Sequence, residues 1–176
     1  VRVMYDGMCC LMLLPYSYPK TLREKGIKCK MFSPIRPALS THQNNRDHRK
    51  ICVIDGHTAF TGGVNLADEY INRKVRFGHW KDTAVMVEGD AAVGFTMMFL
   101  QMWGVTEQEK ERYESYLKPA DYRLPKDADA SGFVIPYGDS PLDKENVGEQ
   151  VYLDILGHAK KYVHIMTPYL ILDDEM

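Results

Sequence analysis

The first 32 residues place a helix between two short strands, and this order restricts the possible folds more than any other feature. "VRVMYDG" is an apolar run that stops at Asp6–Gly7, which predicts a short buried strand. "YPKTLREKG" contains helix formers and ends at Gly26, a natural C-terminal cap. "IKCKMF" then alternates apolar and polar residues, as a half-buried strand does. Two strands connected through a helix pair in parallel with a right-handed crossover, so an α/β fold is expected.

The middle of the chain predicts further strands and a long helix. Residues 33–47 contain two prolines and many polar turn formers, which indicates a loop. "RKICVI" and "DTAVMVEG" are expected to be strands, and "ICVI" should be interior because it is apolar on both faces. "DAAVGFTMMFLQMWG" is so apolar that a helix there must be buried on most sides. We therefore expect the α/β class, with a mixed, mostly parallel β-sheet flanked by helices.

The last third of the chain predicts a second round of strand and helix. "TEQEKERYESYL" is polar and helical in pattern, and residues 118–131 have the prolines and charges of a connection. "GFVIPYG" is expected to be an edge strand because Pro136 cannot donate to a neighbouring strand. "NVGEQVYLDILGHAKK" has helical spacing, and "YVHIMTPYLI" has the composition of a strand. We expect one domain over residues 1–131 and the start of a second repeat over 132–176.

Composition excludes several classes of protein. The net charge is -2, which argues against a broad basic surface covering many phosphates, so no nucleic-acid partner is expected. No apolar run is long enough to span a bilayer. The cysteines at positions 9, 10, 29 and 52 include no C-x-x-C pair. They are expected to be buried free thiols in a reducing cytoplasm, with Cys52 inert inside its strand.

Residues 44–65, "NNRDHRKICVIDGHTAFTGGVN", form the most specific pattern in the chain. In a strand, residues two apart face the same way, so His48 and Lys50 are expected on one face. Asp55–Gly56 is a strong signal for a hairpin turn that sends the chain back antiparallel. An imidazole and an ammonium would therefore lie at the open end of a hairpin.

The returning strand of this hairpin ends in residues that suit anion binding. Gly62, Gly63 and Asn65 would lie beside the start of the first strand. "LADEY" is then expected to begin a helix whose free N–H groups attract an anion. Glycines let the backbone approach a ligand, and the amide and ammonium can hold phosphate oxygens while the imidazole attacks. This pattern points to phosphoryl transfer with no metal and no cofactor.

Basic residues bracket the pattern, and two interpretations of them are open. They form either a solvated face, the commoner explanation of scattered charge, or a surface for anionic lipid headgroups, which their position favours. The cluster consists of Arg46, Arg49, Arg73, Lys74, Arg76 and Lys81. His57 is expected to be an exposed turn residue, and the remaining histidines form no recognisable metal site.

The spacing of His48, Lys50, Asp55 and Asn65, with a double glycine between, resembles the H-x-K-x4-D signature of the phospholipase D superfamily. Six fixed positions are far more specific than a lone G-x-G-x-x-G. The patterns "TGGVNLADEY" and W-x-D-T are similar to those of bacterial cardiolipin synthases and not of the small nucleases. The resemblance covers most of the chain, through "VRVMYDG", "LREKGIKCKMF", "NNRDHRKICVIDG", "FTGGVNLADEY", "FGHWKDT" and "YVHIMTPYLILDDEM".

The resemblance implies roles for the residues around the phosphate. His48 would attack phosphorus and form a phosphohistidine. Lys50 and Asn65 would hold the phosphate oxygens, with Gly62 and Gly63 completing the binding site. These five residues would together form half of an active site.

The resemblance also implies roles for two aspartates. Asp55 would support the local geometry, and Asp82, in "WKDT", would orient the nucleophilic histidine as in a triad. Members of the family use two such motifs, the second histidine protonating the leaving group, whereas this chain has one. The chain is therefore expected to be the first half of the catalytic region of a cardiolipin synthase, inactive by itself.

A parent protein of this kind would transfer a phosphatidyl group between two phosphatidylglycerol molecules, giving cardiolipin and glycerol. Its partners would be anionic phospholipid, the membrane surface and the second catalytic half. It would work at the cytoplasmic face of the cell membrane, held by transmembrane helices outside this chain, which itself would be soluble. Two alternatives stay open: a single-motif nuclease or phosphodiesterase active as a homodimer, and a phosphate or lipid-headgroup binding module without activity.

Overall fold

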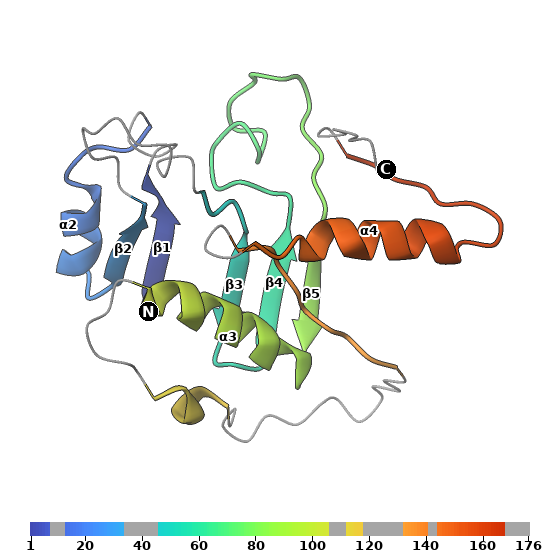
Figure 1. Cartoon of the computed structure of the whole chain (residues 1–176). Helices are drawn as coiled ribbons and strands as arrows, with labels where there is room; N and C mark the ends of the chain where they lie inside the picture. Colours follow the sequence, from blue (N-terminus) through green and yellow to red (C-terminus); the bar gives the residue numbers. More distant parts are fainter. Residues whose placement is uncertain (8–12, 34–45, 106–111, 118–131, 141–143, 168–176) are drawn as a thin grey trace, which may run out of the picture. The chain divides into compact units, whose positions relative to one another are not determined.

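The computed structural model describes residues 1–7, 13–33, 46–105, 112–117, 132–140 and 144–167. They belong to two compact units, Val1–Pro136 and Tyr137–Met176. Helices and strands occur together, including a parallel pair, so the expected α/β class is confirmed (Figure 1). Whether the second unit begins a repeat of the first stays a prediction.

The first unit opens with the predicted strand, helix and strand. β1 (Arg2–Asp6) pairs in parallel with β2 (Lys28–Phe32), and α2 (Tyr18–Glu24) connects them. Pro19 lies in the first turn of α2, where its missing N–H costs no helical hydrogen bond. Gly26 follows the helix at a φ of 76°, which glycine adopts without strain. β1 is half-buried along its length rather than buried.

A three-stranded antiparallel sheet lies at the centre of the first unit. β3 (Ile51–Ile54), β4 (Thr58–Gly62) and β5 (Ala84–Glu88) are neighbours in that order. Asp55, Gly56 and His57 connect β3 to β4, since the register pairs Ile54 with Thr58. Asp55 and Gly56 adopt left-handed φ values of 52° and 76°, and the N–H of His57 donates to the carbonyl oxygen of Ile54 at 3.2 Å, which closes a tight turn. The predicted hairpin is confirmed, and parallel pairing among the described strands is limited to β1 and β2.

β3 lies at an edge of the described sheet, so the prediction of an interior strand is wrong. Ile51 and Val53 pack against the core, whereas Cys52 and Ile54 are exposed. The reason is that β3 has one neighbouring strand and one covered face among the described residues. The expectation of a buried thiol therefore fails for Cys52, while Cys29 in β2 is buried.

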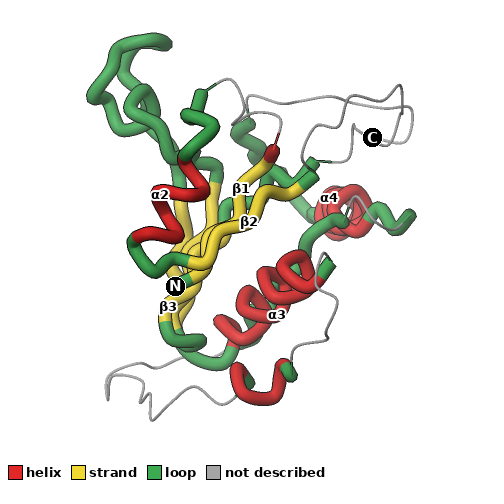
Figure 2. The backbone as a smooth tube through the Cα atoms, turned by 90° about the vertical axis from the view of Figure 1, so that its left-hand side faces the viewer, coloured by secondary structure: helices red, strands yellow, loops and turns green. Residues whose placement is uncertain are grey.

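One long helix covers the three-stranded sheet and supplies most of the core. α3 (Ala91–Gly104) lies alongside the sheet (Figure 2). It places Ala92 and Phe95 against Ala59 of β4, and both alanines are 0% exposed. These small side chains let the helix lie close to the sheet. Gln101 is the one exposed residue of α3, which confirms the helix that was expected to be buried on most sides.

Two cations connect the end of α3 to the parallel pair. Lys30 of β2 donates to the carbonyl oxygen of Trp103 at 2.8 Å and lies 4.5 Å from the centre of its ring. Arg2 of β1 lies over the rings of Trp103 and Tyr116 and donates to the Tyr116 hydroxyl at 2.6 Å. Lys30 thus occupies the helix C-terminus, where the macrodipole favours a positive charge. Tyr116 belongs to η2 (Tyr113–Tyr116), the described end of the predicted polar helix.

The second unit contains the predicted helix α4 (Val147–His158). Its start is held by Asp139, whose Oδ1 accepts from the N–H of Gly148 at 2.8 Å. None of the described helices in either unit has the length and apolar character needed to cross a bilayer.

Two predicted strands are wrong within the described residues. "GFVIPYG" and residues 162–167 of "YVHIMTPYLI" have no regular secondary structure. A strand needs a neighbour for its N–H and C=O groups, and no described strand pairs with either segment. Phe133 and Ile135 are accordingly 97% and 80% exposed. The predictions for residues 34–45, 106–111, 118–131 and 168–171 lie outside the described residues.

The core predicts a large difference between two Phe→Ala substitutions. Phe95 is 7% exposed and packs with Ala59 and Ala92, whereas Phe133 is 97% exposed. Phe95→Ala should lower the free energy of unfolding by about 3–5 kcal/mol, because it leaves a cavity in the core. Phe133→Ala should change it by about 0.5 kcal/mol or less. Urea unfolding followed by circular dichroism measures both, and equal losses would contradict the described core.

Candidate active site

His48 lies in the segment directly before β3, which has no regular secondary structure, and its side chain is exposed. Asp47 and Arg49, which flank His48, form a bidentate ion pair. Arg49 Nε lies 2.9 Å from Asp47 Oδ1, and Arg49 Nη2 lies 2.8 Å from Asp47 Oδ2. The N–H of Arg49 also donates to Asp47 Oδ1 at 3.2 Å. Because Asp47 and Arg49 flank His48 in the chain, this pair holds the backbone on both sides of the imidazole.

The ammonium of Lys50 lies against the backbone of His48, and a common strand face for the two side chains stays a prediction. Its Nζ donates to the carbonyl oxygen of His48 at 2.7 Å. The ammonium is thus held against the backbone of the residue whose imidazole it accompanies. A positive charge placed there can stabilise an anion bound beside the imidazole.

The surroundings of His48 favour its neutral imidazole. The ring of His48 is exposed but loses part of its water to neighbouring atoms, and this desolvation lowers its pKa. The charge of Lys50 lowers the pKa further. Asp6 and Asp47 raise the pKa but are outweighed, so it lies below its ordinary value. The neutral imidazole is the form that can act as a nucleophile, and the described environment maintains it at neutral pH.

Asp6 is a member of this site that the sequence pattern did not indicate. It ends β1, and it lies 3.8 Å from Arg46 in an ion pair whose side chains are 12% and 24% exposed, respectively. Together with Asp47, it is one of the two acidic residues whose charge acts on His48. The available signal was its position at the carboxyl end of a parallel strand, where α/β folds place their ligands.

Arg49 and Asp47 were also missed as a pair, because Arg49 was included in a scattered basic cluster. Burial raises the pKa of Asp47, but the hydrogen bonds and charge of Arg49 outweigh it and hold that pKa below its ordinary value. The Asp-x-Arg spacing, which would put both side chains on one side of a strand, was the signal for this contact.

The double glycine lies against the segment that enters β5. A Cβ on Gly62 would lie 2.7 Å from the Cα of Ala84, and one on Gly63 would lie 2.6 Å from Oδ1 of Asp82. The N–H of Gly63 donates to the carbonyl oxygen of Thr83 at 3.2 Å. Larger residues would force these segments apart, so the glycines allow close packing of protein against protein. Continuing the register from Ile51 opposite Thr61 places Gly62 beside Lys50.

Asp82 is bound within its own segment. Its Oδ2 accepts from Trp80 Nε1 at 3.1 Å, and its Oδ1 accepts from the N–H of Thr83 at 2.8 Å. Among the described residues, it forms no hydrogen bond with His48, and its charge is not one of those that shift the pKa of His48. Its orienting role therefore stays a prediction.

Asn65 comes after β4, from which Gly63 and Val64 separate it, but the helix predicted at "LADEY" is wrong. The segment forms turns instead, in which Ala67 donates to the carbonyl oxygen of Asn65 at 3.2 Å. Asn72 has a φ of 58°, and Tyr70 packs on Trp80 with their rings 5.1 Å apart, so the chain closes into a loop. The described structure therefore has no helix N-terminus at this position to attract a phosphate.

Asp55 lies in the hairpin turn, at the opposite end of β3 from His48. It is exposed and adopts the left-handed φ of 52° that this turn uses. This position separates it from the group formed by His48, Lys50 and the double glycine.

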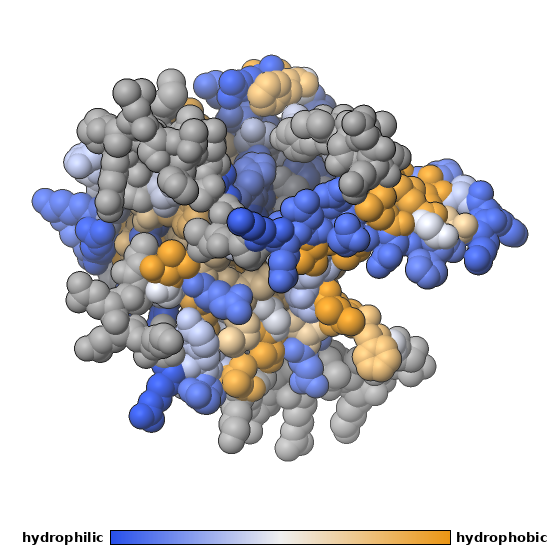
Figure 3. Space-filling model, viewed as in Figure 1, coloured by the Kyte–Doolittle hydropathy of each residue, from blue (hydrophilic) through white to orange (hydrophobic). Residues whose placement is uncertain are grey.

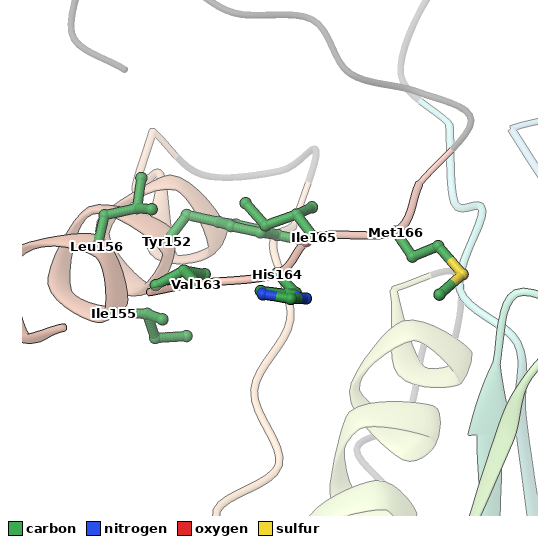
Figure 4. A pocket seen from close by; sticks show the side chains of 7 residues that line it. All are labelled: Tyr152, Ile155, Leu156, Val163, His164, Ile165 and Met166. Carbon is green, nitrogen blue, oxygen red and sulfur yellow. The ribbon is translucent and has the colours of Figure 1, made fainter. Parts of the chain in front are cut away.

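The described part of the second unit has a hollow of its own. It measures about 260 Å³ and is mostly lined by apolar side chains (Figure 4). The lining residues are Tyr152, Ile155, Leu156, Val163, His164, Ile165 and Met166. None of the predicted site residues lines it. No group of three or more potential metal ligands occurs among the residues that the structure describes.

The chain matches longer proteins over its whole length. It is 59% identical over 176 residues to a protein of Streptococcus mutans that is named only as uncharacterized, and it covers 37% of that protein. It is 36% identical over 177 residues to a cardiolipin synthase of Alkalihalophilus pseudofirmus and 34% identical to cardiolipin synthase 2 of Bacillus cereus, and it covers 34% of each. The chain thus spans about a third of the length of these relatives. No family model and no solved structure matches it.

The charges around His48 predict opposite effects of two substitutions on its pKa. Lys50→Met removes a positive charge and should raise the pKa of His48, whereas Asp6→Asn removes a negative charge and should lower it. The pKa is measured from the pH titration of the imidazole signals by NMR. Among the signals of the six histidines, that of His48 is identified as the one that disappears in His48→Gln.

Lys20→Met is the matched control for this titration, because the side chain of Lys20 is 79% exposed in α2 and pairs with Glu24. It should leave the pKa of His48 unchanged. Shifts in the same direction for Lys50→Met and Asp6→Asn would show that the described arrangement of charges is wrong.

Proposed function

We propose a function for this chain from the premise that it belongs to the cardiolipin synthases of the phospholipase D superfamily, with which it aligns over its whole length. In this proposal, the parent protein transfers a phosphatidyl group from one phosphatidylglycerol to a hydroxyl of another. The products are cardiolipin and glycerol. The chain contributes the nucleophile and part of the phosphate-binding site.

The proposed reaction has two displacements at phosphorus. A ring nitrogen of neutral His48 attacks the phosphorus of the first phosphatidylglycerol, the P–N bond forms, and the P–O bond to the glycerol headgroup breaks. The leaving oxygen takes a proton from an acid that the second catalytic half supplies. A hydroxyl of the second phosphatidylglycerol then attacks phosphorus, the P–N bond breaks, and the proton of that hydroxyl passes to the same group of the second half.

The setting of His48 is the observation that supports this proposal best. The imidazole is exposed to a substrate, its pKa is lowered so that it is neutral, and the ammonium of Lys50 lies beside its backbone. A neutral nucleophile beside a fixed positive charge suits a phosphodiester, whose negative charge grows in the transition state. No described group other than His48 combines these properties at the motif.

The remaining motif residues have supporting roles in the proposal. Lys50 and Asn65 bind the phosphate oxygens, and Gly62 and Gly63 let the backbone approach the phosphate. Asp82 is a positioning residue for His48: a carboxylate can accept about four hydrogen bonds, and two are used in the described structure. Asp55 maintains the hairpin turn.

The parent is proposed to meet its substrate at a membrane, because phosphatidylglycerol is a bilayer lipid. The second catalytic half of the parent completes the site. The chain spans about a third of the length of its relatives and carries one motif, so it is proposed to lack this half. The isolated chain is therefore expected to lack activity.

Substitution of His48 in the full-length parent should abolish cardiolipin formation. His48→Ala removes the nucleophile, so the rate should fall by about 10³-fold or more. His57→Ala is the matched control, because His57 lies in the hairpin and its Nδ1 contacts Thr58 Oγ1 at 2.8 Å. Both rates are measured as cardiolipin formed from labelled phosphatidylglycerol, and the His57 variant should keep the unchanged rate.

The 176-residue chain assayed alone under the same conditions should form no cardiolipin. Turnover by the chain that disappears in His48→Ala would disprove the requirement for a second half. Full activity of the His48→Ala parent would disprove the assignment of the nucleophile.

A further inference from the structure

The segment Leu66–Lys81, called the 66–81 loop below, connects β4 to β5 and has a structure of its own. It begins directly after Asn65 and ends directly before Asp82, so both of its ends are candidate site residues. In Figure 1 it is the long loop that extends beyond the ends of β4 and β5. All of its residues are described.

Internal hydrogen bonds hold this loop closed. The side chain of Asn72 donates to the carbonyl oxygen of Trp80 at 2.8 Å and accepts from the N–H of Trp80 at 2.7 Å. Arg76 donates to Glu69 at 3.1 Å, and two backbone N–H groups bind the carbonyl oxygen of Asp68. The loop therefore presents its surface in a defined arrangement.

Three aromatic rings pack together within the loop. Tyr70, Phe77 and Trp80 lie with their ring centres 5.1 to 6.4 Å apart. The rings cover part of one another's apolar surface, but other apolar side chains of the loop stay exposed to water. Leu66 is 101% exposed and Val75 is 83% exposed.

The exposed apolar side chains gather on this loop in spite of their cost in water. Residues 71–79 are all exposed, and they include Ile71 at 53%, Val75 at 83% and Phe77 at 54%. Contiguous apolar side chains on a surface, bordered by polar ones, mark an interaction site. Orange and blue residues lie together over this part of the molecule at the top of Figure 3.

The charge of the loop indicates what it binds. It has four basic and two acidic side chains, in a chain whose net charge is -2. Arg76 pairs with Glu69 and lies over the ring of Phe77 at 4.9 Å. Within the described residues, Arg73, Lys74 and Lys81 form no ion pair, although the charge of Lys74 acts on Glu69. These cations can therefore meet an anionic surface.

We propose that the 66–81 loop docks on the surface of an anionic lipid bilayer. Its aromatic and aliphatic side chains would enter the interface between headgroups and acyl chains, and its basic side chains would meet the headgroups. Aromatic rings with an apolar body and a polar edge are favoured at this depth. The choice of lipid rests on the proposed function, because phosphatidylglycerol is the anionic lipid on which the parent would act.

The position of the loop connects docking to the candidate site. A bilayer that binds the loop would lie near Asn65 and Asp82, the residues at its two ends. Lipid headgroups would then reach the neighbouring His48 and Lys50 from the bilayer surface. The loop would determine which phosphates come near the imidazole.

Vesicle binding by the 176-residue chain tests this proposal without any catalytic turnover, so its outcome is separate from that of the proposed function. The probes are vesicles of phosphatidylcholine alone and vesicles of equal parts phosphatidylcholine and phosphatidylglycerol. Co-sedimentation should give a partition coefficient at least about tenfold higher for the anionic vesicles.

Two double variants of the loop separate its apolar and basic contributions. Val75→Ser with Phe77→Ser should lower the partition coefficient about tenfold or more, because the buried apolar area is lost. Arg73→Gln with Lys74→Gln should lower it by about 10- to 30-fold on anionic vesicles and little on neutral ones. One matched control is Phe133→Ser with Ile135→Ser, and the other is Lys20→Gln with Lys25→Gln. Both change exposed residues outside the loop, and their partition coefficients should equal that of the unsubstituted chain.

A measurement on the unchanged chain gives an independent readout. The chain has two tryptophans, and Trp103 is 5% exposed in the core. Lipids brominated on their acyl chains should therefore quench mainly Trp80, and only in anionic vesicles. Equal binding to both vesicles, equal losses in the control variants, or absence of quenching would overturn the proposal. A chain that binds no vesicle but binds the rest of the parent protein through this loop would also overturn it.

Discussion

The close packing of Gly62 and Gly63 against residues 82–84 is the constraint on which the rest of the first unit depends. It lets β5 pair with β4, and α3, which follows β5, then covers the sheet with Ala92 and Phe95. The same contact brings the two ends of the 66–81 loop together, so that the loop is closed at its base as well as by Asn72 and Trp80. The double glycine of the motif is thus explained first by packing, and any approach to a phosphate comes in addition.

The chemistry of the candidate site depends on competing effects at His48. Desolvation and Lys50 favour the neutral imidazole, and Asp6 and Asp47 oppose them with less effect. Asp47 is itself engaged by Arg49 through two side-chain hydrogen bonds, which reduces the influence of its charge on His48. A protein that uses His48 as a nucleophile needs this balance, because the protonated ring has no lone pair to offer.

Features with a local physical signal could be predicted from the sequence. The hairpin follows from Asp55–Gly56, α2 from its helix formers and Gly26, and α3 from its apolar residues, since each depends on neighbours in the chain. The position of a strand in the sheet could not be predicted, because "ICVI" would be equally apolar in an edge or an interior strand. Whether "GFVIPYG" forms a strand depends on a pairing partner elsewhere in the chain, which its own sequence does not reveal. In the site, the spacing identified His48 and Lys50 as neighbours, but Asp6 lies some forty residues earlier and comes near only through the fold. The helix predicted at "LADEY" was wrong because aromatic packing and Asn72 close a loop where the local sequence favours a helix.

The central claim is that His48 forms a covalent bond to the phosphorus of a lipid. The most direct measurement is to mix the full-length parent with phosphatidylglycerol, stop the reaction within one turnover in denaturant at neutral pH, and identify the modified peptide by mass spectrometry. The account predicts a phosphatidyl group on the peptide that contains His48. A modified residue elsewhere would contradict it. So would release of the headgroup alcohol from a donor lipid without acceptor hydroxyls, if no adduct appears on His48.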